Sequence, residues 1–298
     1  MLDVHRLRLL REVHRRGSLA AAARALSYTP SAISQQLSQL EAETRVVLLE
    51  RVGRGVRLTD AALLLVSHAD AVLEQLELAE AELAASQHEV VGQLRVATFG
   101  SVLLELVPAA LSHLARTHPR LRVVVSQQEP DPAVEGLLAH DFDVVMGEEY
   151  PGLPSARVSG VDEDDLLDDE IHLAVPKSGP LARRGLQLEN YADAPWVLDP
   201  PGVSSGTWGL TLCRSAGFEP DVRFTTLDPL MHLHLVETGH AVGLVPHLAT
   251  TGRHHDVRLL RLPGRPARRL FSAVRHGGAT HPAVATFREG LRQGLRAP

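Results

Sequence analysis

Short, uncharged polar side chains gather on one predicted helix near the start of the chain. Thr29 is suited to cap a helix that begins at Pro30, where the missing N–H of proline costs no hydrogen bond. The apolar residues of that helix fall at spacings of four and three: Ile33, Leu37 and Leu40. The residues left on its outer face are compact or polar: Pro30, Ser31, Ser34, Gln35 and Ser38. Hydroxyl and amide groups can meet phosphates and base edges without desolvating a charge. We predict that this face contacts nucleic acid, with an ordinary solvent-facing surface as the alternative.

A second polar group, made of arginine and glycine, follows at residues 51–57. Arg51, Arg54 and Arg57 surround Gly53 and Gly55, just before Val56 and Leu58. This pattern predicts a wing whose guanidinium groups can reach a flanking phosphate or a minor groove.

The charge of the chain is unevenly distributed. Its net charge is −6, but residues 1–58 carry ten Arg against five Asp and Glu, a net of +5. Residues 59–91 carry seven acids and no base, and the rest of the chain is mildly acidic. A basic N-terminal segment joined to an acidic remainder suggests that only the N-terminal segment binds a polyanion.

Several helices must position these residues. Ser18 is a good cap for a helix whose small residues, Ala22 and Ala23, let the next helix cross closely, as a helix-turn-helix requires. Residues 60–89 predict one long helix capped by Asp60. Its apolar residues keep a 4-3-4-3-4 spacing: Leu65, Ala69, Val72, Leu76, Ala79 and Leu83. These residues form an apolar stripe, the predicted seam of the helix. The simplest partner for this seam is the same helix in a second subunit, and packing of the helix against its own domain is the alternative.

From about residue 93 the pattern alternates between strands and helices. Strands at 94–100, 121–126 and 142–147, with helices at 102–117 and 131–139 between them, predict a parallel βαβαβ unit. A second set of elements begins with a strand at 170–176. It continues with helices near 205–216 and 229–238 and a strand near 241–246. Residues 268–275 and 281–295 predict a strand and a helix that return to the first lobe.

Several N-terminal motifs resemble the signature of the LysR-type transcriptional regulators in order and spacing. They are Gly17-Ser18-Leu19, Ala22-Ala23, the run from Pro30 to Leu37, Leu40-Glu41, Leu48 to Arg51, and Val56 to Thr59. The resemblance extends over essentially the whole chain. It implies a winged helix-turn-helix, a linker-helix dimer and a C-terminal domain like periplasmic binding proteins. It also implies homodimers or homotetramers on double-stranded promoter DNA, controlled by a small inducer.

We therefore predict an α + α/β protein in three parts. These are a winged helix-turn-helix DNA-binding domain at 1–58, a linker and dimerisation helix at 59–91, and an effector-binding domain at 92–298. In the last part, lobe I would comprise about 92–165 and 268–298, and lobe II about 166–267. Carried over by position, the resemblance implies these DNA-facing residues: Pro30, Ser31, Ser34, Gln35 and, on the wing, Arg54.

The chain departs from the family pattern at the entry to the wing. Thr44-Arg45 stands where the family favours Leu-Gly, and Leu49 where it favours Phe. Ala61-Ala62 replaces a later Ala-Gly. We expect Arg45 to occupy an ordinary turn position and Leu49 to fill an aromatic-sized pocket incompletely.

Two lobes joined by crossing strands would leave a ligand cleft at the carboxyl ends of the parallel strands. The resemblance places inducer contacts in the same loops. The candidates are Thr98, Gly100, Ser101, Ser204, Ser205, Thr207 and Val245. Ser101 precedes a predicted helix, so a carboxylate is one effector that this site could hold. Serines and glycines at strand ends are also common caps and turns, which is the alternative.

The sequence favours a regulator over two other classes of protein. A solute-binding protein with an appended helical domain should carry a secretion signal, and the N-terminus lacks the apolar stretch of one. An enzyme should show a catalytic or cofactor motif, and the sequence contains no dinucleotide, Walker or nucleophile-elbow pattern. We expect no catalytic residues and no cofactor.

Histidine, cysteine and hydropathy point to no further site. The sixteen histidines include no compact set with metal-ligand spacing, so we expect no metal site. The single cysteine, Cys213, excludes an internal disulfide and is most simply a packing residue. No apolar run is long enough to span a membrane, and a cytoplasmic location is the default expectation.

Overall fold

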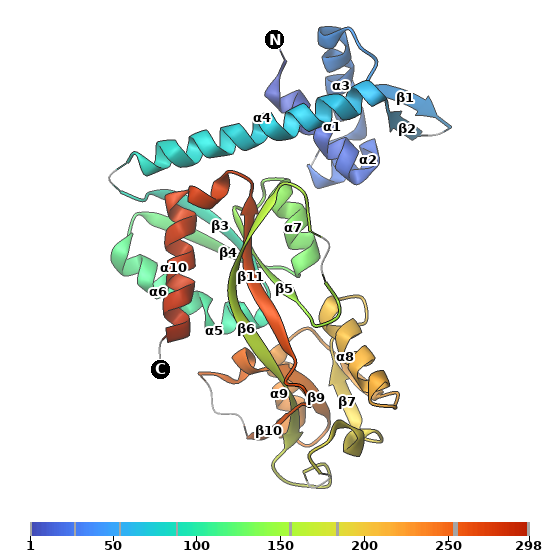
Figure 1. The fold of residues 1–298 in the computed structure, drawn as a ribbon, viewed down its shortest axis with the longest axis vertical. Helices are drawn as coiled ribbons and strands as arrows, with labels where there is room; N and C mark the ends of the chain where they lie inside the picture. Colours follow the sequence, from blue (N-terminus) through green and yellow to red (C-terminus); the bar gives the residue numbers. More distant parts are fainter. Residues whose placement is uncertain are drawn as a thin grey trace.

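Three helices and a two-stranded sheet form the N-terminal part of the protein (Figure 1). The computed structural model describes residues 2–26, 28–53, 55–87, 89–154, 157–182, 185–252 and 256–296. The N-terminal elements are α1 (Val4–Arg16), α2 (Leu19–Ala25), α3 (Pro30–Thr44), β1 (Leu49–Val52) and β2 (Gly55–Leu58). The strands β1 and β2 pair antiparallel as a wing. The predicted winged helix-turn-helix is confirmed.

Local capping explains where these helices begin. The side chain of Ser18 accepts a hydrogen bond from the N–H of Ala21, and that of Thr29 accepts one from Ala32. Pro30 occupies the first turn of α3, as predicted. The apolar stripe of α3 is fully buried against the other two helices: Ile33, Leu37 and Leu40.

The turn that enters the wing differs from the sequence expectation. Arg45 ends α3 in the left-handed conformation, with φ 55° and ψ 33°, and does not occupy an ordinary turn position. The wing entry is held by the Glu41 carboxylate, which accepts hydrogen bonds from the N–H groups of Leu48 at 2.7 Å and Leu49 at 3.0 Å. A non-glycine residue is strained in this conformation, which explains why a glycine suits the position.

The linker helix α4 (Asp60–Ala85) is shorter than predicted, and its cap is Thr59 rather than Asp60. The Thr59 hydroxyl accepts a hydrogen bond from the N–H of Ala62, so Asp60 becomes the first helical residue. The predicted seam divides into two halves. Leu65 and Ala69 pack into the core of the helix-turn-helix, so the expectation of packing within its own domain holds for this half. The C-terminal half lies in solvent: Val72 is 40% exposed, Leu76 44% and Leu83 71%.

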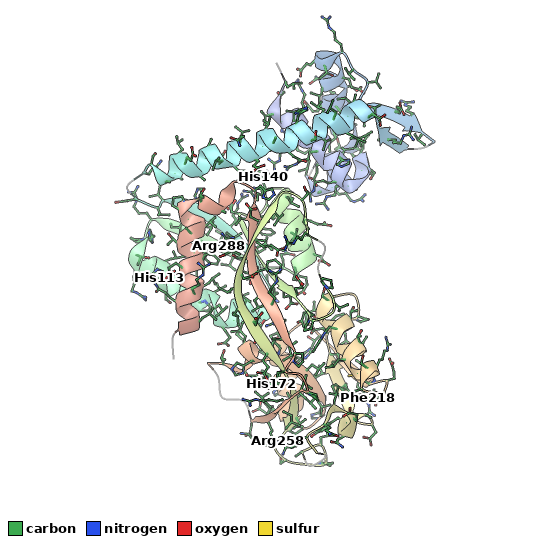
Figure 2. All side chains as sticks on the ribbon, in the orientation of Figure 1. His113, His140, His172, Phe218, Arg258 and Arg288 are labelled. Atoms are coloured by element: carbon green, nitrogen blue, oxygen red, sulfur yellow. The ribbon has the colours of Figure 1, made fainter. Side chains whose placement is uncertain are left out.

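Charged side chains join the N-terminal part to the α/β part. Glu77 of α4 accepts a hydrogen bond from Arg275 at 2.6 Å and lies 3.3 Å from His140, whose side chain Figure 2 shows just below α4. Burial, and then nearby arginines led by Arg275, lower the pKa of His140 to about 2, so its ring is neutral. From α1, Arg11 donates to the carbonyl of Leu138 at 3.2 Å.

The α/β part is built on one continuous sheet that passes through both lobes. Its strand order is β4-β3-β5-β11-β6-β9-β7-β8, with β10 paired to β6. The strands are β3 (Gly92–Thr98), β4 (Leu121–Gln127), β5 (Val144–Glu149), β6 (Val161–Pro176), β7 (Pro195–Leu198), β8 (Asp221–Thr225), β9 (Val242–Pro246), β10 (Val257–Arg261) and β11 (Ala267–Arg275). The helices are α5 (Gly100–Glu105), α6 (Val107–Thr117), α7 (Pro130–Leu138), α8 (Ser204–Ser215), α9 (Pro229–Glu237) and α10 (Pro282–Arg296). The long antiparallel strands β6 and β11 connect the lobes (Figure 1).

Two of these elements differ from the sequence expectation. The stretch 102–117 forms two helices, with Leu106 between them and Pro108 in the first turn of α6. Proline lacks an N–H and clashes with the preceding turn, so it separates the helices. The strand β6 begins at Val161 and not at residue 170, although its first half is rich in acids. Glu163 and Asp165 of this half pair with Arg269 of β11, at 2.6 Å for Glu163, and Arg269 also contacts Glu149 at the end of β5 at 3.1 Å.

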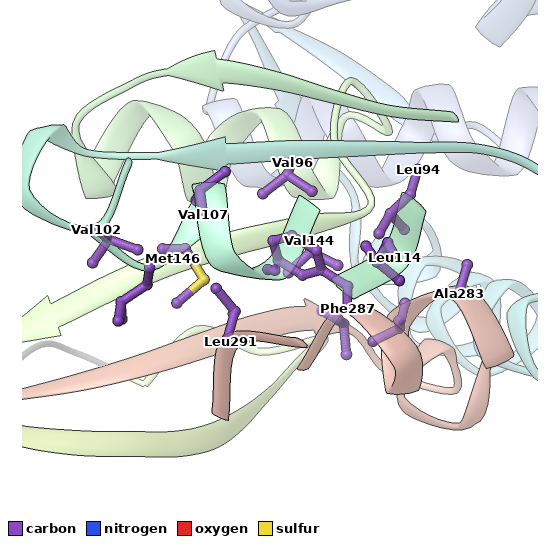
Figure 3. Close-up of a cluster of buried hydrophobic side chains, with 14 of the residues drawn as sticks. Leu94, Val96, Val102, Val107, Leu114, Val144, Met146, Ala283, Phe287 and Leu291 are labelled. Carbon is purple, nitrogen blue, oxygen red and sulfur yellow. The ribbon is translucent and has the colours of Figure 1, made fainter. Parts of the chain in front are cut away.

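Each lobe has its own hydrophobic core. In lobe I, aliphatic residues of β3 and β5, such as Val96 and Val144, pack against Leu114 of α6 and Phe287 of α10 (Figure 3). In lobe II, Trp196 and Tyr191 are fully buried beside Trp208 and Cys213. Two separate cores leave the surfaces between the lobes available for a cleft.

Candidate functional site

The outer face of α3 is a continuous polar surface. Pro30, Ser31, Gln35 and Ser38 are exposed, and Ser34 is half-buried at the edge of the same face. None of these side chains points into the protein interior, because the buried stripe of α3 occupies the opposite side. Figure 1 shows α3 on the side of the N-terminal part that faces away from the lobes.

The wing adds cationic side chains beside that face. Arg51 is exposed on β1, and Arg57 on β2 is paired across the strands with Glu50 at 3.0 Å. Arg54, the other predicted wing residue, lies outside the described residues. The structure thus presents a polar helix face and an arginine-bearing hairpin on one small domain.

A cavity lies where the two lobes meet. It offers about 710 Å³ of atom-free space, including its open mouth. Lobe I contributes Phe99, Gly100 and Ser101, which follow β3, and Glu148 at the end of β5. Lobe II contributes the start of α8 and the end of β9, and Arg268 of β11 lies between them.

Arg268 is the centre of a buried charge cluster. Its residue is 3% exposed, and its guanidinium donates to Glu148 at 2.7 Å, to Asp169 at 2.7 and 3.0 Å, and to the Ser101 hydroxyl at 2.8 Å. Burial pulls the pKa of Arg268 down, but Tyr150, Glu148 and Asp169 outweigh it and raise that pKa above its ordinary value. The guanidinium therefore stays charged and ties four elements of the cleft together.

The other cleft acids face each other. Burial, and then the charges of Glu148 and Asp199, raise the pKa of Glu129 to about 7. Burial also raises the pKa of Glu148, which accepts a hydrogen bond from the Tyr150 hydroxyl at 3.2 Å. His232 places Nε2 3.2 Å from Asp199 and 2.8 Å from the carbonyl of Thr226. Burial opposes protonation of His232, but Asp199 and then Thr226 raise its pKa overall.

The predicted effector residues fall into three groups. Gly100, Ser101, Ser205 and Val245 line the cavity. Ser204 and Thr207 line a neighbouring depression, and the Thr207 hydroxyl donates to the carbonyl of Pro201 at 2.8 Å. Thr98 is fully buried outside the cavity lining. The structure therefore does not bring Thr98, Ser204 and Thr207 to the cavity.

No sequence pattern indicated the charged and aromatic lining of the cavity. Glu129, Glu148, Asp199, His232, Trp208 and Arg268 all line the cavity. The only local signal was that some of them flank the ends of predicted strands.

Gly206 is required for the close approach of α8 to the loop before it. A Cβ at this position would lie 2.1 Å from the Pro200 carbonyl oxygen, so only glycine fits.

The remaining sequence expectations concern metals, cysteine and membranes. Burial raises the pKa of Cys213 to about 12, so its thiol stays protonated and packs in the core of lobe II. Within the ranges that the structure describes, no three His, Cys, Asp or Glu side chains are grouped to hold a metal ion. None of the described helices is both long and apolar enough to cross a membrane.

Two family models match the chain. The model described as "Bacterial regulatory helix-turn-helix protein, lysR family" matches residues 4–63, and the one described as "LysR substrate binding domain" matches residues 87–296. The HTH-type transcriptional regulator TcbR of Pseudomonas sp. (strain P51) is 28% identical over 299 residues, which are 99% of this chain and 100% of TcbR.

Solved structures agree with the family models. The crystal structure of CbnR, a LysR family transcriptional regulator, is 28% identical with a TM-score of 0.55, and the match covers 97% of this chain and 100% of CbnR. Full-length CbnR complexed with its target DNA matches 98% of this chain and 99% of CbnR, with 28% identity and a TM-score of 0.54. The protein therefore belongs to the LysR family of bacterial DNA-binding transcriptional regulators, with a helix-turn-helix domain followed by an effector-binding domain.

Proposed function

We propose that the protein binds promoter DNA by placing the outer face of α3 in a major groove and its wing on the flanking backbone. The contacts would come from Pro30, Ser31, Ser34, Gln35, Ser38, Arg51 and Arg54. The observation that supports this assignment is the exposure of the α3 face opposite its fully buried stripe. CbnR, which is similar over nearly the whole chain, forms a crystallised complex with its target DNA, and this supports DNA as the partner.

Base recognition and backbone contact predict different responses to substitution. Gln35→Ala should weaken binding to the DNA upstream of the gene by about 1–3 kcal/mol and leave binding to random duplex unchanged, because an amide can pair with a base edge. Arg51→Ala should weaken binding to both duplexes and reduce the salt slope by about 1, because a guanidinium neutralises a phosphate. Gel-shift titrations at several salt concentrations measure both effects.

The control is Gln93→Ala, which removes an exposed amide from β3, far along the chain from the helix-turn-helix. It should bind both duplexes like the parent protein. Equal losses on upstream and random DNA for Gln35→Ala, or a loss on upstream DNA alone for Arg51→Ala, would contradict the assigned roles.

We also propose that α4 pairs with its copy in a second subunit, as a homodimer that can assemble further into a homotetramer. The exposed residues Val72, Leu76 and Leu83 form a stripe that the chain itself leaves uncovered. Leu76→Glu should shift the protein toward monomer in sedimentation equilibrium. Gln75→Glu adds the same charge at the adjacent exposed position and should leave the association unchanged.

The small-molecule effector would occupy the cavity between the lobes, with Gly100, Ser101, Ser205 and Val245 among its contacts. The division at residues 58 and 91 into DNA-binding, linker and effector-binding parts belongs to this proposal. So does a cytoplasmic location, where a bacterial regulator meets the chromosome. The relatives are transcriptional regulators, and we assign the protein no catalytic step.

A further inference from the structure

The charges around the interlobe cavity do not balance. Three carboxylates line it, from Glu129, Glu148 and Asp199, and the cations that line it are Arg268 and His232. A fourth carboxylate, Asp169, lies directly behind Arg268. When all four acids are ionised and His232 is protonated, four carboxylates surround two cations.

The guanidinium of the buried Arg268 already donates most of its hydrogen bonds to acidic side chains of the protein. Four of the five N–H groups of the Arg268 guanidinium donate to Glu148, Asp169 and Ser101. An incoming anion would find only one further N–H group on Arg268, unless it displaced one of these carboxylates. Arg268 therefore acts as an internal counter-ion and does not offer a free anion site.

Glu129 remains without such a counter-ion. Within the part of the chain that the structure describes, no hydrogen bond or ion pair is made by its carboxylate. It lies next to α7 on the cavity wall, close enough to Glu148 and Asp199 for their charges to oppose its ionisation. A cation placed among these three groups would relieve their mutual repulsion.

The wall of the cavity also suits an organic cation. Phe99, Tyr150 and Trp208 line it, and the rings of Tyr150 and Trp208 lie 5.5 Å apart. The guanidinium of Arg268 already lies 5.5 Å from the ring of Phe99. Aromatic faces attract ammonium groups and also cover the apolar body of a ligand.

We propose that the effector of this cleft is a small organic cation, an ammonium group on an apolar or aromatic body, held by Glu129, Glu148 and Asp199 against Trp208. This inference rests on the proposed effector role of the cavity. The site itself does not depend on the acids alone, because the cavity lies between the lobes of the domain matched as "LysR substrate binding domain".

The competing ligand is the carboxylate that Ser101 suggested. Its hydroxyl oxygen accepts from Arg268, and the helix that it begins, α5, has only six residues. A carboxylate here would add a further negative charge to the cavity. The two ligand classes therefore predict opposite results with matched compounds.

The test uses amines and acids that share one carbon skeleton. Benzylammonium and 2-phenylethylammonium are compared with benzoate and phenylacetate, and with benzyl alcohol as the neutral analogue, at millimolar concentration. Binding to the full-length protein is measured by calorimetry and by the shift in Tm. We expect at least one amine to bind, and to bind about tenfold more tightly than its acid, a difference of about 1.4 kcal/mol.

A charge-removing variant locates the binding. Glu129→Gln should weaken amine binding about tenfold or more, because it removes a charge partner of similar shape. Glu289→Gln makes the same change on the exposed face of α10 and should bind amines like the parent protein.

The pH dependence of binding provides an independent readout. Ionisation of Glu129, with its pKa of about 7, should tighten amine binding about tenfold between pH 6 and pH 8. The charged groups that face Glu129 are Glu148, Asp199, Asp131, Arg268 and His232, and loss of the His232 proton changes the charge in the same direction. A carboxylate ligand would bind more weakly as the pH rises.

The possible outcomes distinguish the charge of the effector from the location of its site. Tighter binding of the acids, or no binding of any amine, overturns the cationic effector. If the acids bind and Trp208→Ala abolishes their binding, the cavity keeps its effector role and only the ligand charge is wrong. If amines bind equally to the parent, Glu129→Gln and Trp208→Ala, they bind outside the cavity, and the cationic effector of the cleft is overturned.

Discussion

The α3 surface and the interlobe cleft are the two sites that we propose for ligands, and they are built in opposite ways. The α3 surface comes from one continuous segment, residues 30–38, and its side chains are short, exposed and uncharged. The cleft collects side chains from segments as distant as Ser101 and Arg268, and its central groups are charged and buried. The surface meets a polyanion beside an arginine-bearing wing, whereas the cleft has an excess of carboxylates. We infer that the first site can change without unfolding the protein, and that the second is also part of what holds its domain together.

The largest expected effect is the loss of the buried cation. Arg268→Met should destabilise the effector-binding domain by about 3–5 kcal/mol, because Glu148 and Asp169 would remain buried without their partner. Arg57→Met removes the exposed ion pair with Glu50 on the wing and should cost about 0–1 kcal/mol. Denaturant unfolding followed by tryptophan fluorescence measures the first change, since Trp196 and Trp208 lie in lobe II, and circular dichroism of the largely helical N-terminal part measures the second. Equal costs would remove the distinction between the two sites.

The two faces of α3 should differ next in size. Ile33→Ala opens a cavity in a fully buried position and should destabilise the helix-turn-helix by about 2–5 kcal/mol. Ser34→Ala, one residue away on the outer face, should change stability by about 0.5 kcal/mol or less. Circular dichroism during thermal unfolding gives the stability, and gel-shift titration gives DNA affinity. A stability loss at Ser34 as large as that at Ile33 would show that the outer face is structural.

The turn into the wing offers a smaller and stabilising change. Arg45→Gly should raise stability by about 0.5–1 kcal/mol, because glycine relieves the left-handed strain at φ 55° while adding some entropy to the unfolded chain. Arg24→Gly, at an exposed position in the last turn of α2, should instead lower stability by up to about 1 kcal/mol. Opposite signs in the same unfolding assay are expected. A loss of stability for Arg45→Gly would mean that the arginine side chain contributes more than its backbone costs.

The last expected effect depends on pH and comes from the half-buried Glu129. Its pKa is raised from 4.5 to about 7 in the folded protein, so the folded state holds its proton more tightly than the unfolded state does. This contribution to stability is present below about pH 4.5 and is lost as the pH rises to about 7. The Tm of Glu129→Gln should therefore increase relative to the parent between pH 5 and pH 7, with Glu289→Gln as the control. A constant difference in Tm would show that Glu129 titrates normally.

The sequence predicted the exposed face of α3 well and the lining of the cleft poorly, for a physical reason. Along α3 the burial pattern follows helical periodicity, so Ile33 and Leu37 alone indicate which side Ser34 and Gln35 must occupy. Strand ends similarly identified Gly100, Ser101 and Val245, because parallel strands place their carboxyl ends at one edge of the sheet. Thr98 was included wrongly as a cavity residue, since one position along a strand reverses the face.

The linker helix α4 also combines a feature that the sequence predicted with one that it could not predict. Its heptad spacing identified the stripe, and Val72, Leu76 and Leu83 are indeed uncovered. The spacing could not show that Leu65 and Ala69 pack into the helix-turn-helix, because the partner of a stripe depends on which domain lies against it. The acid-rich start of β6 was missed in the same way, since its arginine partners are on β11, about a hundred residues later.

The amino-acid sequence by itself determined the caps, the buried stripes, the polar face of α3 and the membership of a regulator family, because these depend on neighbours within a few residues. Only the tertiary structure decided the composition of the cleft, where Glu129, Glu148, Asp169 and Asp199 meet Arg268 and His232. Electrostatic interactions in a buried site depend on distances of a few ångströms between remote segments. Those distances are set by how β6 and β11 cross between the lobes, which no local pattern records.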